Sequence, residues 1–212
     1  MTKLCKLRRY LKLTLVLSRR EAASRTILDL AAQSFAGGAT ALQLREKNLP
    51  DREFYDEALE LGDLCRREDR LFIVNDRLDL ALAAGADGLH VGQSDLPAAV
   101  AARHLPKDKI LGVSVRTAAE ARAALEAGAD YLGVGAIFAT GSKDDANLVE
   151  LAAIREIIAL GAPCVAIGGL TVENAGLVWD MGFDGLAVIS ALAAAKDPRR
   201  AAEHLIAGAS KG

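Results

Sequence analysis

The stretch AAGADGLHVG, residues 83–92, has three relatives in the chain: AGGATALQLR (36–45), EAGADYLGVG (126–135) and DMGFDGLAVI (180–189). Each contains a glycine of the kind that ends a helix, because glycine adopts the left-handed conformation without a Cβ penalty. A short apolar run follows each glycine and predicts a β-strand. The four glycines stand 47, 43 and 54 residues apart. Since one strand–helix unit takes about 25 to 30 residues, each period holds two units.

Four further apolar runs supply the strands between the repeats, at 11–17, 71–75, 110–115 and 163–169. Such continuous runs are typical of strands buried on both faces of a parallel sheet. Helical patterns separate the strands, at 20–36, 51–68, 77–84, 96–104, 117–127, 148–160, 171–181 and 197–207. Thr117, Thr171 and Asp197 stand at expected helix starts.

Eight strands that alternate with eight helices in a fourfold repeat predict an α/β fold of one domain, a (β/α)8 TIM barrel over residues 1–212. A doubly wound open sheet is the alternative, and it explains the fourfold repeat less well.

The composition favours a globular protein without nucleic acid or membrane partners. The net charge of −2 gives no general attraction for polyanions. The three cysteines follow no metal or redox pattern, and Cys164 is expected to be buried. Basic residues precede a hydrophobic run at the N-terminus, but Lys12 interrupts that run and no small-residue cleavage site follows. We therefore expect a cytoplasmic protein.

Polar residues gather at the expected carboxyl ends of the strands, where (β/α)8 barrels carry their active sites. Gln43 and Arg45 alternate with leucines and so share one face of the second strand. If that face is the barrel interior, burying Arg45 without an anion is costly. A pyrophosphate matches its fork of donors, with Lys47 as a second charge. An internal ion pair with Glu46 or another acid is an equally supported alternative.

Asp76 and Asp95 follow neighbouring strands. Two carboxylates there suit Mg²⁺, which completes its shell with water and phosphate oxygens. Each aspartate also precedes a helix, and for either one alone the N-cap is the better-supported interpretation. Taken together, and beside Arg45 and Lys47, the pair favours the metal.

Gly168 and Gly169 end the seventh strand and Ser190 follows the eighth, where many barrels bind phosphate through backbone N–H groups. A tight turn is the alternative interpretation of the two glycines. The histidines, His90, His104 and His204, are interpreted as core or surface residues, since none stands at a strand end beside another catalytic residue type. The segment TGSK (140–143) lacks the glycine spacing of a nucleotide-binding loop.

Six motifs carry a resemblance to a known family: QLREK, NDRLDLALAAGADGLHVGQSDLP, LGVSV, AGADYLGVGAIFATGSKDDA, AIGGLTVENA and AVIS. In this order and spacing, from about Thr40 to Ala191, the chain resembles the thiamine phosphate synthases. The resemblance implies a (β/α)8 barrel that joins a hydroxymethylpyrimidine diphosphate to a thiazole phosphate and releases pyrophosphate, with Mg²⁺ as cofactor. It also implies phosphorylated small molecules as partners, and a homo-oligomer is possible.

The resemblance implies three groups of site residues. The pyrimidine diphosphate would contact Gln43, Leu44, Arg45, Glu46, Lys47, Asn75, Ser114 and Lys143. The thiazole phosphate would contact Thr140, Gly141, Ser142, Gly169, Ile189 and Ser190. Mg²⁺ would bind Asp76 and Asp95.

The implied chemistry is dissociative: pyrophosphate departs first, and the thiazole nitrogen attacks the pyrimidine methyl cation. This needs charge stabilisation and positioning rather than a histidine base. The catalytic residues would be Arg45, Lys47, Ser114 and Lys143.

Two other functions stay open for such a barrel. A thiazole tautomerase-like paralogue would lack the metal-binding acids and carry a histidine where this chain has Ala136. A non-catalytic barrel that binds phosphorylated ligands would be expected to lack part of one site. The chain departs from the family's usual pattern at Ala136, Ala139 and Glu150 and in SRR (18–20) after the first strand.

Overall fold

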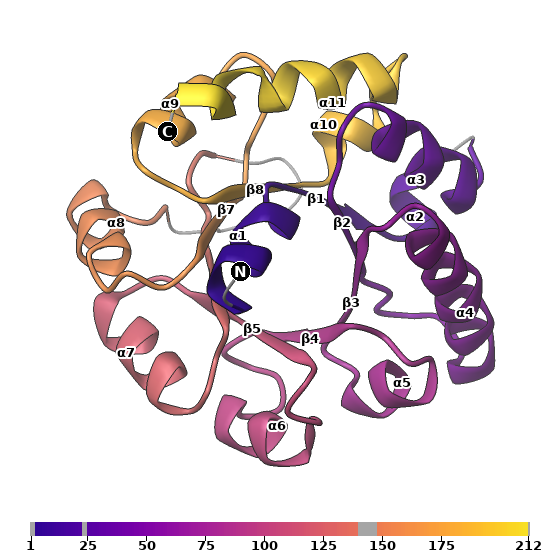
Figure 1. Cartoon of the computed structure of the whole chain (residues 1–212), viewed down its shortest axis with the longest axis horizontal. Coiled ribbons are helices and arrows are strands. Elements are labelled where there is room, and N and C mark those ends of the chain that lie inside the picture. The colour runs from indigo at the N-terminus through magenta and orange to yellow at the C-terminus, as the bar shows by residue number, and fades with distance from the viewer. Residues whose placement is uncertain (1–2, 23–24, 140–147, 212) are drawn as a thin grey trace.

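A computed structural model describes residues 3–22, 25–139 and 148–211, and it shows a closed barrel of eight parallel strands surrounded by helices (Figure 1). The strands are β1 (Leu13–Leu17), β2 (Ala41–Leu44), β3 (Leu71–Asn75), β4 (Gly88–Val91), β5 (Ile110–Val115), β6 (Tyr131–Val134), β7 (Cys164–Ile167) and β8 (Gly185–Val188). Each strand pairs with the next, and β8 closes on β1 with Leu13 opposite Leu186. The predicted (β/α)8 barrel is confirmed.

The helices form the outer ring and one inner plug. They are α1 (Lys3–Tyr10), α2 (Arg19–Ala22), α3 (Ile27–Ala36), α4 (Asp51–Arg67), α5 (Leu78–Ala83), α6 (Ala98–His104), α7 (Ala118–Glu126), α8 (Leu151–Ile158), α9 (Ala175–Asp180), α10 (Ser190–Ala193) and α11 (Pro198–Ile206), followed by a 3₁₀ helix (Ala207–Lys211). Within the described part of the chain, no helix is long and apolar enough to cross a membrane.

Two of the three predicted helix starts are confirmed. Thr117 accepts a hydrogen bond from the Glu120 N–H at 3.1 Å, and Asp197 accepts one from the Arg200 N–H at 3.0 Å. The prediction for Thr171 is wrong, because α9 begins only at Ala175 and residues 172–174 form a turn.

The predicted helix 20–36 is two helices rather than one. The second of them, α3, begins at the side chain of Thr26, which accepts a hydrogen bond from the Asp29 N–H at 3.1 Å. A threonine in that position is typical of an N-cap.

Helix α1, which the sequence analysis did not predict, lies across the centre of the ring of strands at their N-terminal end (Figure 1). Leu7 and Leu11 are buried against side chains of the barrel interior, among them Leu71 and Ile73. Arg8 forms an ion pair with Asp184 at 2.8 Å. The basic and hydrophobic N-terminal stretch therefore closes the bottom of the barrel, which we call the base.

The fourfold repeat has a structural explanation at the base. The repeat glycines Gly38, Gly85, Gly128 and Gly182 all have positive φ angles, of 102°, 66°, 102° and 92°. Such angles favour glycine, so each glycine turns the chain from a helix into the next strand. The residue two positions later is Thr40, Asp87, Asp130 or Asp184.

Each of these four side chains accepts a hydrogen bond from a backbone N–H at the start of the preceding strand. The distances are 3.0 Å from Leu13 to Thr40, 2.8 Å from Phe72 to Asp87, 3.0 Å from Leu111 to Asp130 and 2.9 Å from Cys164 to Asp184. The backbone N–H of each clamping residue donates in return to the carbonyl of the same partner. We call these four pairs the strand clamps, and they join β1 to β2, β3 to β4, β5 to β6 and β7 to β8.

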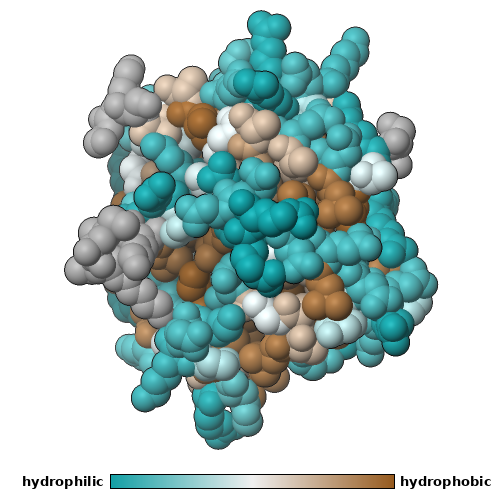
Figure 2. Space-filling view, turned by 45° about the vertical axis from the view of Figure 1, so that its right-hand side comes forward, coloured by the Kyte–Doolittle hydropathy of each residue, from teal (hydrophilic) through white to brown (hydrophobic). Residues whose placement is uncertain are grey.

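The apolar side chains form two layers. The larger layer lies between the strands and the outer helices and contains, for example, Leu42, Leu44 and Leu89. The smaller layer fills the lower half of the barrel interior, against α1. Hydrophilic residues predominate on the outer face seen in Figure 2, where hydrophobic residues form separate small patches. Above the smaller layer the interior becomes polar, and this change locates the candidate site.

Candidate active site

A cavity of about 530 Å³ opens at the C-terminal end of the strands, which we call the mouth, and all eight strands or the loops after them contribute to its lining. It brings together ten of the predicted site residues: Gln43, Arg45, Lys47, Asn75, Asp76, Asp95, Ser114, Gly169, Ile189 and Ser190. The predicted residues Thr140, Gly141, Ser142 and Lys143 lie outside the described residues.

Two predicted site residues have side chains that do not line the cavity. Leu44 is fully buried in the layer between the barrel and the helices. Glu46 points to the loop after β1, where its Oε1 accepts a hydrogen bond from the Arg19 N–H at 2.5 Å. The side chain of Glu46 thus joins two loops of the mouth.

In the segment SRR (18–20), which departs from the family's usual pattern, Arg19 forms a network of charges with α4. The Arg19 guanidinium donates to Glu53 at 2.7 Å and also to the buried carboxylate of Glu57. Burial raises the pKa of Glu57, while the Arg19 charge opposes that change. Together with the bond to Glu46, this network holds the loop after β1 against β2 and α4.

Arg45 and Lys47 form the basic side of the cavity next to Asp76, and Arg116 also lines the cavity. Among the described residues, neither Arg45 nor Lys47 forms an ion pair with an acid, so the internal ion pair considered above is not observed there. The two positive charges lower the pKa of Asp76, but burial and the neighbouring Asp95 raise it by more. Two cations without partners in a cavity are suited to an anionic ligand.

The acidic side consists of Asp76 and Asp95. Burial and the adjacent carboxyl group of Asp95 raise the pKa of Asp76 to about 6, so the two carboxyl groups are close neighbours. The alternative that they cap helices is wrong, because Arg77 and Pro97 occupy the N-cap positions of α5 and α6. The Oδ2 of Asp95 instead accepts a hydrogen bond from the Gly92 N–H at 2.8 Å.

The floor of the cavity contains a polar group that the sequence analysis missed. His90 is a buried core residue, as interpreted, but it also lines the cavity. Its Nδ1 lies 2.8 Å from the Tyr131 hydroxyl and its Nε2 lies 2.9 Å from Ser114 Oγ. The alternation of the strands could have revealed this contact, because His90 and Ser114 both occupy inward positions of adjacent strands.

Thr14 adds an unused hydrogen-bonding group to this floor. Its side chain is only 2% exposed, it lines the cavity, and its Oγ1 has no hydrogen-bond partner in the described structure. A buried hydroxyl without a partner is costly, so Thr14 is available to bind a ligand or a water molecule.

Gly168 and Gly169 form a tight turn with φ angles of 101° and 65°. A Cβ on Gly168 would lie 2.6 Å from the Cβ of Ala136, and one on Gly169 would lie 2.6 Å from the Phe138 carbonyl oxygen. The glycines thus allow the loops after β6 and β7 to approach closely. A phosphate site at this turn stays a prediction.

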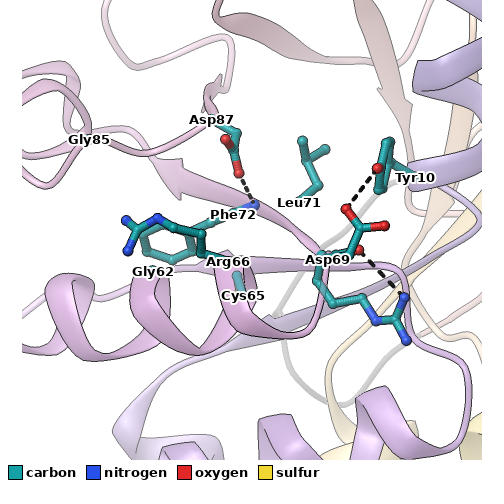
Figure 3. A pocket seen from close by; sticks show the side chains of 10 residues that line it. Tyr10, Gly62, Cys65, Arg66, Asp69, Leu71, Phe72, Gly85 and Asp87 are labelled. Carbon is teal, nitrogen blue, oxygen red and sulfur yellow. Dashed lines mark hydrogen bonds between the residues drawn. The ribbon is translucent and has the colours of Figure 1, made fainter.

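A second cavity, of about 300 Å³, lies at the base beside α1 (Figure 3). Its two aspartates are already bonded: Asp69 accepts from the Tyr10 hydroxyl at 3.0 Å and Asp87 from the Phe72 N–H at 2.8 Å. Burial raises the pKa of the Cys65 thiol in its wall to about 12, which keeps the thiol protonated. The carboxylates of this crevice are thus already hydrogen-bonded and its thiol is protonated, so the mouth is the better candidate.

Comparisons with known proteins agree with this assignment. A family model described as thiamine monophosphate synthase matches residues 13–192. A thiamine-phosphate synthase of Moorella thermoacetica is 51% identical over 197 residues, covering 91% of this chain and 93% of that protein. One of Coprothermobacter proteolyticus is 46% identical over 200 residues, covering 94% and 95%.

A solved structure agrees as well. A thiamine phosphate pyrophosphorylase from Pyrococcus furiosus is similar with a TM-score of 0.86 and 43% identity, covering 94% of this chain and 95% of that chain. Since the model and these relatives match most of the chain, the chain belongs to the thiamine monophosphate synthase family.

Proposed function

We propose that this thiamine phosphate synthase, a transferase, carries out its reaction in the mouth cavity, with the diphosphate of the pyrimidine substrate between Arg45 and Lys47 on one side and Asp76 and Asp95 on the other. The observation that carries the proposal is the pair of cations without ionic partners that faces a pair of carboxylates in one cavity. A diphosphate alone would suit the cations, and a divalent cation between it and the carboxylates would balance the acidic side.

The donor set fits Mg²⁺. Burial and the neighbouring Asp95 carboxyl group disfavour the charged form of Asp76 and raise its pKa to about 6, and a divalent cation would remove that conflict. Among the described residues, no group of three His, Cys, Asp or Glu side chains forms a metal site. Mg²⁺ would therefore take two protein carboxylates and complete its shell from diphosphate and water. When bound there, it would neutralise charge on the departing diphosphate.

The chain's own residues would act mainly by positioning charge. Arg45 and Lys47 hold the diphosphate while the bond between its oxygen and the pyrimidine methyl carbon breaks, and the electron pair goes to that oxygen. The thiazole nitrogen then donates its lone pair to the methyl carbon. Neither step transfers a proton to or from the protein, so the mechanism needs no acid or base beside Arg45 and Lys47.

The acceptor would occupy the opposite side of the mouth. Gly169, Ile189 and Ser190 line this side, and the resemblance assigns Thr140, Gly141 and Ser142 to the same phosphate. Lys143, from the same segment, is assigned to the diphosphate. The apolar side chains of Val165, Ile167 and Ala187 line the wall between the two sides. They would limit the access of water to the pyrimidine methyl cation, which would otherwise react with water.

Product formation tests this function. The purified chain is incubated with the pyrimidine diphosphate, the thiazole phosphate and Mg²⁺, and thiamine phosphate and pyrophosphate are quantified. We expect both products in equal amounts, and no product when either substrate or Mg²⁺ is omitted. Absence of product from authentic substrates would contradict the assignment. We also propose a reducing, cytoplasmic location, which the free buried thiols of Cys65 and Cys164 support; cell fractionation tests it.

A further inference from the structure

We infer that Gln43, Tyr131 and His90 form a directed hydrogen-bond chain that fixes the Ser114 hydroxyl as a donor into the mouth cavity. The three are positioning residues, while Ser114 contacts the substrate. The inference rests on the proposed function in one respect, because the acceptor of the Ser114 hydrogen bond is taken to be the diphosphate.

The chain is built from three buried residues and the partly buried Ser114, on four neighbouring or facing strands. Tyr131 lies 2.8 Å from His90 Nδ1, and Ser114 Oγ lies 2.9 Å from His90 Nε2. Both ring nitrogens of His90 are thus occupied by hydroxyl groups. The side chain of Gln43 lies near the Tyr131 hydroxyl, and both residues line the cavity. All four residues line the cavity or its floor.

Two glycines make room for the pair of rings. A Cβ on Gly112 would lie 2.2 Å from the Tyr131 ring and 2.5 Å from His90 Nδ1. A Cβ on Gly133 would lie 2.9 Å from His90 Cε1. Glycine at these two inward positions is therefore required by the rings, which indicates that the barrel interior is shaped around the His90–Tyr131 contact.

The ionisation of the two rings limits how protons are arranged. The His90 ring is buried and both of its nitrogens face hydroxyl groups rather than carboxylates, so the ring is taken as neutral, with one donor and one acceptor nitrogen. Burial raises the pKa of Tyr131, which therefore keeps its proton. The neighbouring Gln43 amide opposes that increase.

An anionic ligand distinguishes the two possible directions. If Nδ1 of His90 carried the proton, Tyr131 would donate its own hydrogen to the amide oxygen of Gln43, and Ser114 would spend its single hydrogen on Nε2. Oxygen lone pairs of Ser114 would then face an anionic ligand. In the other direction Gln43 donates to Tyr131, Tyr131 donates to Nδ1, and Nε2–H donates to Ser114. The Ser114 hydrogen is left for the diphosphate.

The protonated nitrogen of His90 is the direct test, and it requires no substrate. The chain has three histidines, so a ¹⁵N-histidine NMR spectrum of the full protein at pH 7.5 is assigned by comparison with His90→Gln. We expect His90 to be neutral with its proton on Nε2. A proton on Nδ1, or a charged ring, would overturn the inference even if the enzyme makes thiamine phosphate normally.

A kinetic comparison tests the effect on Ser114. Tyr131→Phe removes only the hydroxyl that donates to His90, so we expect a mixture of the two His90 tautomers and a kcat lowered by about fivefold to tenfold, the usual effect of one hydrogen bond, with little change in KM. Tyr10→Phe, at the base, is the matched control and should leave kcat and the His90 signal unchanged. Unchanged kcat and tautomer in Tyr131→Phe would overturn the inference.

Discussion

The two ends of this barrel use polar side chains in opposite ways. At the base the same contact occurs four times, and each strand clamp is satisfied by hydrogen bonds of 2.8 to 3.0 Å. At the mouth the strand ends carry different polar residues, and Arg45, Lys47 and the Thr14 hydroxyl have no ionic or hydrogen-bond partner among the described residues.

This difference separates stability from chemistry within one fold. Polar groups that satisfy one another hold strands together, whereas polar groups that lack partners retain binding energy for a ligand. Repetition in the sequence marks the base, and departure from the repeat marks the mouth. In the repeat at 36–45, for example, the inward residue Gln43 is followed by Arg45, whereas the repeat at 180–189 has apolar residues at the equivalent positions.

The largest expected effect is at the mouth. Arg45→Ala should lower kcat/KM by about a hundredfold to a thousandfold, as the loss of a charge-stabilising donor usually does, while the melting temperature changes little. Steady-state kinetics and calorimetry measure the two. Arg66→Ala, in the wall of the base crevice, is the control and should retain wild-type kinetics. If the two variants behaved alike, the separation of the two ends would be wrong.

His90 makes stability depend on pH. Its pKa of about 4 lies below the ordinary value, so the unfolded chain takes up a proton first as the pH falls. The contribution of the neutral His90 ring to the free energy of unfolding is fully present above about pH 6.5. It is lost as the pH falls towards 4, and the free energy of unfolding falls by about 3 kcal/mol. Chemical unfolding between pH 7 and 4 should therefore show a steeper loss in the wild type than in His90→Gln. Parallel profiles would mean that His90 is not held neutral.

Asp76→Asn should make the protein more stable and less active. The substitution removes the repulsion between the two carboxyl groups, and asparagine tolerates the positive φ of 62° at this position. We expect a kcat lowered by about tenfold or more with weaker dependence on Mg²⁺, and a free energy of unfolding raised by about 1 kcal/mol. The exposed Asp108→Asn should change neither. A less stable Asp76→Asn would contradict the unfavourable pairing.

At the base the expected effect is on stability alone. Asp87→Ala leaves the buried Phe72 N–H without its acceptor, so the free energy of unfolding should fall by about 1 to 2 kcal/mol, while kcat stays at the wild-type value. Asp87→Asn keeps an acceptor oxygen and should lose less. Urea unfolding and the product assay check both variants, and a fall in kcat for Asp87→Ala would link the base to the chemistry.

The sequence predicts the barrel because its signal is repeated. Gly85 and Asp87 recur in register with an apolar strand, so a single weak pattern gains strength from its copies. Helix α1 has no copy, and its role as a plug depends on Leu7 and Leu11 meeting side chains of distant strands. Local propensity contains no such information.

The cavity residues were predictable in part for the same reason. Arg45 and Asp76 stand at strand ends, a position that the fold identifies as the active-site end. His90 lies within a strand, and its role depends on contacts with Tyr131 and Ser114 from two other strands. The strand clamp of Asp87 was visible as a repeat, but its partner Phe72 required the register of β3 against β4.

A crystal structure with the pyrimidine diphosphate and Mn²⁺ in place of Mg²⁺ tests the central claim most directly, because the anomalous signal of manganese locates the metal. We predict one anomalous peak at the mouth, bound by Asp76 and Asp95 and by diphosphate oxygens, with Arg45 and Lys47 on the remaining oxygens. Diphosphate and metal bound in the base crevice, or in the mouth without contact to either aspartate, would contradict the assignment of chemistry to this end of the barrel.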